Sequence, residues 1–299
     1  MNRLPIRSFL FIPGDSEKKL AKVDDCGADA VILDLEDAVA PENKPKAREM
    51  VADFLAQRAG VWRPQIWVRV NPLDTGMTEG DLQAIMAGQP DGIIQPKTDR
   101  PNDVATVSSM LDRLEHANGI AEGSTPIIPV ATETAIAPFH LGEFAGANLS
   151  RLAGLTWGAE DLATAIGATT NRDANGDWLF TFKMVRSLTL LASHAAGVQA
   201  IDTLHADFRD DEGLRHSSLQ ARAEGFSGRL AIHPAQVAII NQCFTPTMAE
   251  VEHSQSVLDA FAANPGAGTV GLNGKMLDIP HRKQAERIMA EARAFGLVD

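Results

Sequence analysis

The stretch Asp29-Ala-Val-Ile-Leu-Asp-Leu-Glu-Asp-Ala-Val39 combines an aliphatic run with a cluster of carboxylates. A short continuous apolar run such as Ala30–Leu35 is typical of a parallel strand that is buried on both faces. Acidic residues follow at the point where this strand is expected to end. The stretch therefore predicts a buried strand whose carboxyl end carries chemically useful side chains.

The same pattern recurs along the chain and gives eight strand candidates in all. The other seven are Ser8–Ile12, Ile66–Val70, Gly92–Gln95, Ile127–Val130, Leu152–Thr156, Val198–Ile201 and Leu230–Ile232. Longer stretches with helical periodicity lie between them, namely Ser16–Cys26, Glu42–Ala59, Asn102–Asn118, Lys183–Ala196 and Leu214–Glu224. Eight alternating units predict an α/β protein with a (β/α)8 TIM barrel. An open doubly wound sheet is the alternative, but no GxGxxG motif follows the first strand candidate.

Two more helix candidates, Thr247–Ala263 and Pro280–Phe295, follow the predicted barrel. The glycine-rich linker between them, Asn264–Lys275, suits a mobile or turning segment. We therefore expect a catalytic barrel over residues 1–245 and a C-terminal helical arm over residues 246–299. The arm either covers the active site of a neighbouring subunit or packs as a lid on its own barrel.

The composition of the chain argues against several classes of protein function. The chain has 27 Lys and Arg against 39 Asp and Glu, a net charge of −12, which argues against nucleic-acid and anionic-membrane partners. The two cysteines, Cys26 and Cys243, lack any CxxC context, so neither a disulfide framework nor a zinc site is expected. Neither a signal peptide nor a membrane-spanning run of about 18 apolar residues is recognisable, and we expect a reducing, cytoplasmic location.

Active sites of TIM barrels lie where the strands end, so the residues there are the candidate site. They include Glu36, Arg69, Lys97, Glu133, Asp161 and His233. Clustered carboxylates repel one another unless a cation neutralises them, and oxygen ligands favour Mg²⁺. Each carboxylate could instead cap a helix, and His233 could be structural. Lys97 could form a Schiff base, but an electrostatic role is the favoured interpretation.

Motifs along nearly the whole chain carry a family resemblance. They are Arg7–Gly14, Asp29–Val39, Val68–Asn71, Gln95–Lys97, Glu133–Thr134, Trp157–Leu162, Gly228–Gln236 and Gly274–Pro280. In this order they resemble the citrate lyase β-subunit-like group of the HpcH/HpaI aldolase family, which includes malyl-CoA and citramalyl-CoA lyases. The resemblance implies a trimeric TIM barrel that binds Mg²⁺ and a CoA or acyl-carrier thioester.

The resemblance also implies roles for individual residues. Glu133 and Asp161 match the metal ligands, and Arg69 matches the arginine that neutralises the substrate oxygens. Glu36 matches a carboxylate near the metal-bound waters. Asp278, in the C-terminal tail, matches the acid/base aspartate that a neighbouring subunit donates.

The expected reaction is cleavage or formation of a 3-hydroxyacyl thioester of the malyl-CoA, citramalyl-CoA or citryl-CoA type, with a 2-oxo acid as partner. The backbone N–H groups of Ala159, Glu160 and Asp161 are expected to open a helix and bind the substrate carboxylate. Lys97 and His233 are further candidates for substrate binding. Two motifs depart from the family pattern, Gly228-Arg229 and Leu272-Asn273-Gly274-Lys275, and both lie where a CoA-type substrate is expected.

Three other functions remain open. A malyl-CoA-type thioesterase would use the same site with water as the attacking group. A citrate lyase β-subunit would act on a substrate bound to an acyl carrier. A degenerate binding module would lack a metal ligand or Arg69, and neither is missing here.

Overall fold

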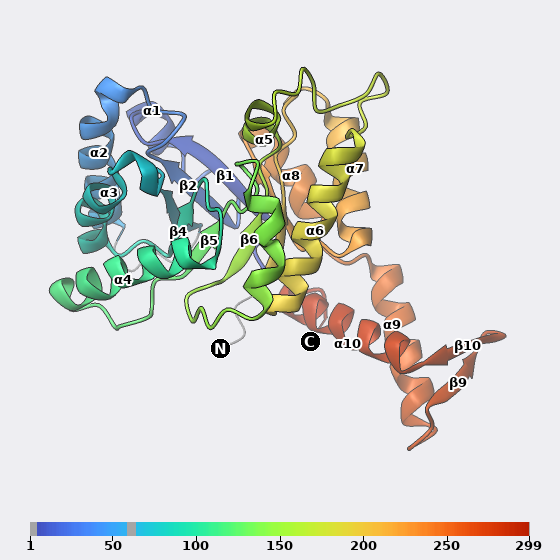
Figure 1. Cartoon of the computed structure of the whole chain (residues 1–299). Coiled ribbons are helices and arrows are strands. Elements are labelled where there is room, and N and C mark those ends of the chain that lie inside the picture. The colour runs from blue at the N-terminus through green and yellow to red at the C-terminus, as the bar shows by residue number, and fades with distance from the viewer. Residues whose placement is uncertain (1–4, 59–63, 299) are drawn as a thin grey trace. The chain divides into compact units, whose positions relative to one another are not determined.

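In the computed structural model, which describes residues 5–58 and 64–298, eight parallel strands form one sheet (Figure 1). The strands are β1 (Ser8–Pro13), β2 (Ala30–Asp34), β3 (Gln65–Arg69), β4 (Gly92–Gln95), β5 (Ile127–Pro129), β6 (Gly154–Thr156), β7 (Gln199–Asp202) and β8 (Gly228–Ala231). Their order is β5-β4-β3-β2-β1-β8-β7-β6. Single bridges, Ile127 to Leu152 and Val130 to Thr156, join β5 to β6 and close the ring. The predicted TIM barrel is confirmed.

Helices follow the strands along the chain and lie on the outside of the barrel (Figure 1). They are α1 (Glu17–Leu20), α2 (Lys44–Gln57), α3 (Thr78–Ile85), α4 (Pro101–Asn118), α5 (Ala159–Ala165), α6 (Phe180–Ala196), α7 (Asp211–Glu224) and α8 (Pro234–Cys243). Short 3₁₀ helices cover Pro41–Asn43 (η1), Leu73–Thr75 (η2), Met86–Gly88 (η3) and Ala137–Ala145 (η4). None of the described helices is long and apolar enough to cross a membrane.

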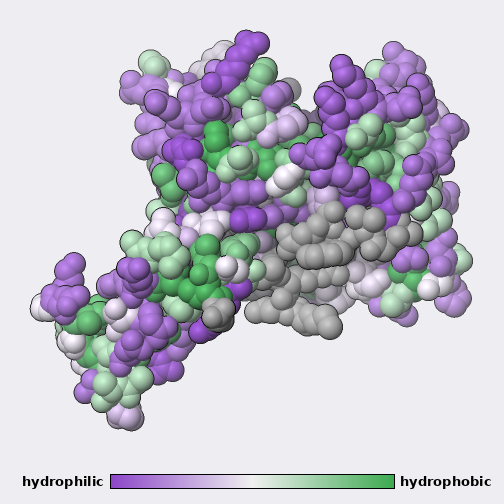
Figure 2. Space-filling view, turned by 180° about the vertical axis from the view of Figure 1, so that it is seen from behind, coloured by the Kyte–Doolittle hydropathy of each residue, from purple (hydrophilic) through white to green (hydrophobic). Residues whose placement is uncertain are grey.

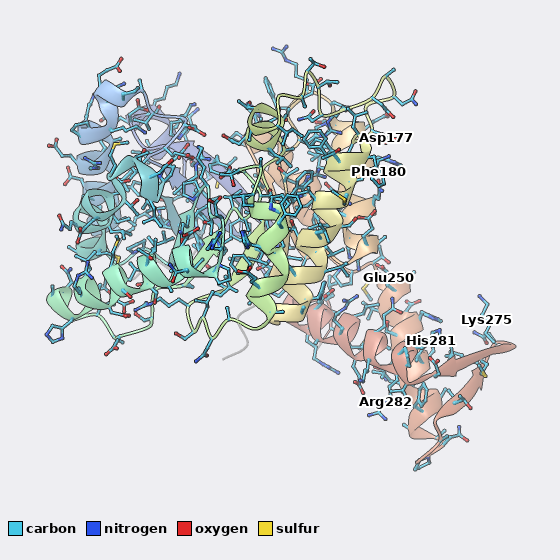
Figure 3. The ribbon with its side chains drawn as sticks, viewed as in Figure 1. Asp177, Phe180, Glu250, Lys275, His281 and Arg282 are labelled. Carbon is cyan, nitrogen blue, oxygen red and sulfur yellow. The ribbon has the colours of Figure 1, made fainter. Side chains whose placement is uncertain are left out.

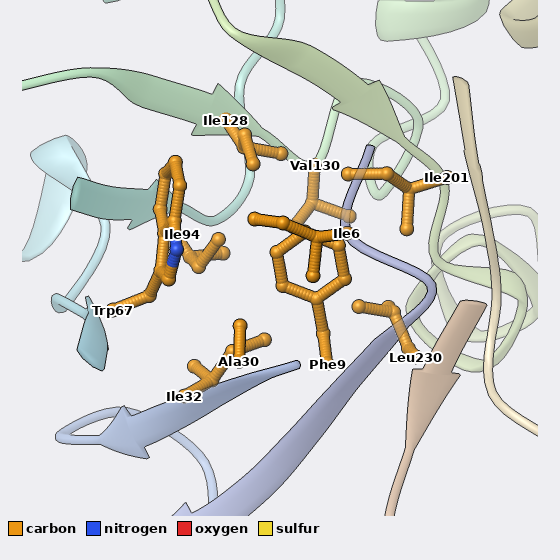
Figure 4. Close-up of a cluster of buried hydrophobic side chains, with 10 residues drawn as sticks. All are labelled: Ile6, Phe9, Ala30, Ile32, Trp67, Ile94, Ile128, Val130, Ile201 and Leu230. Carbon is orange, nitrogen blue, oxygen red and sulfur yellow. The ribbon is translucent and has the colours of Figure 1, made fainter. Parts of the chain in front are cut away.

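The barrel interior is filled by side chains from the strands and from flanking residues such as Ile6 and Val130 (Figure 4). Phe9 and Trp67 meet edge to face, with ring centroids 6.1 Å apart. A Cβ atom at Gly92 would lie 2.2 Å from the Trp67 ring, so this position requires glycine. Hydrophilic residues cover much of the outer surface, with apolar residues between them (Figure 2).

Two helix predictions need correction. Ser16–Cys26 is helical only over Glu17–Leu20. Beyond it the amides of Lys22, Val23, Asp25 and Cys26 bond three residues back, which gives turns rather than an α-helix. The Glu42–Ala59 candidate divides into η1 and α2, and its last residue, Ala59, lies outside the described residues.

A second compact unit begins at Gln242, while the barrel unit spans Ile6–Asn241. The second unit contains α9 (Met248–Ala262), the antiparallel strands β9 (Thr269–Leu272) and β10 (Lys275–Asp278), and α10 (Ile279–Ala294). The linker expected to be mobile or turning is thus largely a hairpin. Its two-residue turn, Asn273-Gly274, has positive φ at both positions, as a type I′ turn requires.

Candidate active site at the barrel mouth

Arg69 is fixed at the carboxyl end of β3 by two carboxylates. Its Nε and Nη2 donate to both oxygens of Asp34 at 2.8 and 2.7 Å, and its Nη1 lies 2.8 Å from Glu36 Oε2. The guanidinium also covers the Phe11 ring, 4.7 Å from its centroid. A bidentate pair and an aromatic face together leave the guanidinium little rotational freedom.

Asp34 does more than cap a loop. Its two oxygens also accept hydrogen bonds from the backbone amides of Glu36 and Ala38, at 2.9 and 3.1 Å. The same side chain therefore shapes the loop after β2 and orients Arg69. The sequence did not predict its pairing with Arg69, because that pairing depends on strand register.

Lys97 lies between the acidic groups of the mouth. Its Nζ bonds Glu36 and lies 3.6 Å from both Asp37 and Asp161. Burial alone would lower the pKa of Lys97, but Glu36, Asp161 and Asp37 together raise it above its usual range. The ammonium form therefore persists at neutral pH, which favours the electrostatic role over Schiff-base chemistry.

Glu133 and Asp161 bring two carboxylates to one place. Glu133 is buried, and its Oε2 accepts the backbone N–H of Lys97 at 2.6 Å. Burial and the charge of Asp161 raise the pKa of Glu133 to about 8. Gly158 makes room for this side chain, because a Cβ atom there would lie 2.7 Å from Glu133 Cγ.

A cavity of about 180 Å³ opens beside these groups. Its charged lining consists of Asp34, Arg69, Glu133, Glu160 and Asp161. Its larger apolar side chains are Phe11, Val130, Trp157, Leu204, Leu230 and Ile232.

The cavity suits a hard divalent cation. Within the described residues, no cluster of three His, Cys, Asp or Glu side chains forms a complete metal site. Mg²⁺, however, commonly takes only one or two carboxylates and fills its remaining positions with water and substrate. Glu133 and Asp161 can supply two oxygen donors. A cation there would relieve the repulsion that raises the pKa of Glu133.

The other predicted site residues divide into two groups. Ala159, Glu160 and Asp161 line the cavity at the start of α5. His233 is not among the lining residues; its ring stacks on Phe208 at 4.6 Å. Its role in substrate binding stays a prediction.

Asp278 belongs to the second compact unit, where it ends β10 and precedes α10. Its Oδ1 lies 2.5 Å from Nδ1 of His281, which Figure 3 labels. Sequence reasoning did not find this histidine partner. The acid/base role of Asp278 stays a prediction.

Arg229, one of the two departures from the family pattern, lies in β8. It is fully buried, and its guanidinium donates to the Thr203 carbonyl and to the hydroxyls of Ser217 and Ser218. It therefore ties β8 to α7. Its expected place near a CoA-type substrate stays a prediction.

A TIM barrel whose mouth combines paired carboxylates with a fixed arginine defines a class of enzymes that act on small anionic substrates with an oxygen-ligated cation. The chain belongs to the HpcH/HpaI aldolase/citrate lyase family, whose model matches residues 7–234. The family resemblance predicted from the motifs is therefore confirmed, and this is a family of lyases.

Three relatives are similar in sequence to this chain over nearly its full length. Citrate lyase subunit beta of Escherichia coli K12 is 34% identical over 97% of this chain and 94% of its own length. Mitochondrial citramalyl-CoA lyase of Mus musculus is 32% identical over 98% and 87%. A (3S)-malyl-CoA thioesterase of Cereibacter sphaeroides is 35% identical over 98% and 96%.

Solved structures share the fold. CitE of Mycobacterium tuberculosis, in complex with magnesium, acetoacetate and coenzyme A, covers 98% of this chain and 100% of its own, with a TM-score of 0.80 and 30% identity. The citrate lyase beta subunit of the same organism, complexed with oxaloacetate and magnesium, has a TM-score of 0.69 and 32% identity, covering 81% and 98%.

Proposed function

We propose that this chain is a Mg²⁺-dependent carbon–carbon lyase that cleaves or forms a 3-hydroxyacyl-CoA, with an acyl-CoA and a 2-oxo acid as the other reactants. The observation that carries the proposal is the meeting of Glu133, Asp161 and Arg69 around one cavity. Family membership supports the reaction class, and relatives that bind magnesium, oxo acids and coenzyme A support the ligands.

Glu133 and Asp161 would hold the cation. Mg²⁺ bound there supplies Lewis acidity and a template for the oxo acid. Glu36, which faces both Arg69 and Lys97, keeps these two cations in place beside it.

Arg69 stabilises charge that develops on a substrate oxygen. Preorganised donors of this kind usually contribute the largest single share of catalysis, because they need no rearrangement during the reaction. Asp34 and Glu36 already hold the guanidinium in position. The N–H groups of Ala159, Glu160 and Asp161 complete the proposed contacts with the substrate carboxylate.

Asp278 moves the proton at the α-carbon of the thioester. A carboxylate suits this general acid/base role. Its assignment rests on the motif match and not on the geometry of the barrel mouth. We propose that it comes from a neighbouring subunit of a homotrimer.

An unpartnered apolar face on the barrel supports self-association. The side chains of Phe180, Met184, Leu188 and Leu191 share one face of α6 and are 79%, 44%, 38% and 65% exposed. Phe180, labelled in Figure 3, begins this face. Phe139 of the contacting η4 is 82% exposed. Apolar faces of this kind usually mark interfaces. A reducing cytoplasm is the compartment that we propose, and neither Cys26 nor Cys243 forms a disulfide in the described structure.

The test is condensation by the purified protein. Acetyl-CoA or propionyl-CoA is mixed with an oxo acid and Mg²⁺, and the new 3-hydroxyacyl-CoA is identified by mass spectrometry. Glu133→Gln should abolish the Mg²⁺-dependent reaction without unfolding the barrel. Glu143→Gln, at an exposed position on η4, is the matched control and should behave as wild type.

Other outcomes identify the alternatives. Release of free CoA from a 3-hydroxyacyl-CoA, with no oxo acid formed, would assign a thioesterase. Turnover only of acyl-carrier-bound substrates would assign a citrate lyase β-subunit. Full activity in Glu133→Gln would overturn the metal assignment.

A further inference from the structure

The cavity at the barrel mouth has a marked charge imbalance. Its described lining contains one basic side chain, Arg69, and four acidic ones, Asp34, Glu133, Glu160 and Asp161. A bound divalent cation would compensate only part of this excess. A substrate that brings one carboxylate can use that cation, but a second carboxylate would face net negative charge.

Two cations at the barrel mouth, Arg69 and Lys97, are already engaged with carboxylates. Arg69 is paired with both oxygens of Asp34 and with Glu36. Lys97 bonds Glu36 and lies within 4 Å of Asp37 and Asp161. Neither is a free partner for a second substrate carboxylate.

The uncharged part of the lining is mainly apolar. Val130, Leu204, Leu230 and Ile232 offer methyl groups, and the indole N–H of Trp157 is committed to Asp202 at 2.7 Å. A carboxylate placed against such a wall would lose its hydration without gaining a partner, whereas a methyl group would gain contact.

Resting on the proposed function, we propose that the oxo acid is monocarboxylic, with hydrogen or a methyl group beside its oxo carbon, and that dicarboxylic oxo acids are excluded. Pockets for drug-sized ligands have volumes of roughly 300 to 1,000 Å³. The volume of this cavity, about 180 Å³, is smaller and therefore agrees with a small oxo acid. The wall residues therefore set the choice among oxo acids that the family as a whole leaves open.

The experiment compares glyoxylate, pyruvate and oxaloacetate with the whole protein and Mg²⁺. For each acid, kcat/KM is measured in the condensation direction, and binding is measured separately by calorimetry. Glyoxylate or pyruvate should exceed oxaloacetate by on the order of 100-fold in kcat/KM, because an unpaired charged group is strongly rejected. Binding should follow the same order.

A charge introduced at the wall tests the cause. Ile232 follows β8, lines the cavity and is 38% exposed, so a longer side chain can be accommodated there. Ile232→Arg should improve oxaloacetate binding at least tenfold relative to pyruvate. Ile232→Gln, similar in length but uncharged, should improve it far less.

The outcomes separate the two proposals. A higher kcat/KM for oxaloacetate than for pyruvate would overturn the proposed selectivity and leave the lyase proposal intact. Absence of condensation with all three acids would overturn the lyase proposal, and calorimetry would still decide which acid the cavity accepts. Equal effects of Ile232→Arg and Ile232→Gln would contradict the charge argument.

Discussion

At the scale of single residues, one guanidinium organises the mouth of the barrel. Arg69 bridges Asp34 and Glu36, so its position depends on β2 and the loop that follows it as well as on its own strand. A planar guanidinium can pair with one carboxylate through two parallel N–H bonds while it reaches a second carboxylate, and an ammonium cannot supply this bidentate geometry.

Arg69→Lys should lower kcat by roughly 10²- to 10³-fold, the usual effect of losing one preorganised donor to a developing oxyanion. Steady-state kinetics of the condensation reaction would measure this loss. Arg113→Lys, in an exposed pair with Glu79, is the matched control. Near-normal turnover in Arg69→Lys would mean that Arg69 is structural only.

Gly158→Ala should weaken Mg²⁺ binding, because the added Cβ would displace Glu133. We expect the concentration of Mg²⁺ required for half-maximal activity to rise about tenfold or more, the usual effect of disturbing the groups that orient a metal ligand. Gly142→Ala is the control, since no atom lies within 4 Å of its Cβ position. An unchanged Mg²⁺ requirement in Gly158→Ala would remove Glu133 from the proposed metal site.

The strand-end rule predicted most of this site from the sequence. Glu36, Arg69, Lys97, Glu133 and Asp161 all lie at the mouth, because parallel strands of a barrel place their carboxyl ends on one rim. Their pairing could not be predicted in this way. It depends on strand register and on side-chain directions that local sequence does not specify.

At the scale of elements, the strands were predicted well and the helix limits less well. Buried strands have continuous apolar runs, and their predicted ends differ from the observed ones by two residues or fewer. Helix ends depend instead on backbone bonding. The i→i−3 bonds after Leu20 end α1 early, although the residues that follow could continue a helix.

A buried ion pair joins α4 to the segment before β6. Arg151 donates to both oxygens of Glu115 at 2.7 and 2.5 Å, and the amides of Gly123 and Thr125 bond the same carboxylate. Burial alone would raise the pKa of Glu115, but these bonds lower it to about 2. The resulting stabilisation is complete above pH 4.5, the usual pKa of the group, and is lost as pH falls toward 2.

Glu115→Gln should therefore destabilise the barrel at pH 7 by up to about 3–5 kcal/mol, because it leaves the buried Arg151 with the partly exposed Asp112 as its remaining charged partner. Urea unfolding at pH 7 and pH 3 would measure the loss, and the difference from wild type should shrink at pH 3. Glu79→Gln, which breaks an exposed pair, should cost less than about 1 kcal/mol. Equal losses in the two variants would contradict the buried-pair interpretation.

The apolar face of α6 makes a prediction of its own. Leu191→Lys places a charge in that face and should dissociate the proposed oligomer, because a buried unpaired charge opposes association. Sedimentation velocity would show the smaller species. Leu219→Lys on α7, where an exposed leucine lies outside this face, should leave the oligomer unchanged. An intact oligomer in Leu191→Lys would place the interface elsewhere.

At the scale of the whole molecule, the chain forms two compact units, and the proposed site residues are divided between them. The barrel unit carries the carboxylates and Arg69, and the unit that begins at Gln242 carries Asp278. Asp278 lies at the junction of a hairpin and a helix, and its side chain is 43% exposed. The neighbouring side chains of Met276 and Ile279 are 72% and 38% exposed, which suits contact with another surface.

We predict that Asp278 completes the active site of a neighbouring subunit, where closure would exclude water from an enolate. Subunits carrying Asp278→Asn and subunits carrying Arg69→Lys should each be inactive alone. After mixing and exchange in equal amounts, about a quarter of the mouths should combine an intact Arg69 with an intact Asp278 from the adjacent subunit. Activity should therefore recover toward a quarter of the wild-type value. Mixtures of differently tagged Arg69→Lys subunits provide the control and should stay inactive. Exchange is verified by co-purification of the two tags. If verified mixed oligomers regain no activity, Asp278 serves its own barrel or takes no part in the reaction, and the arm is not shared.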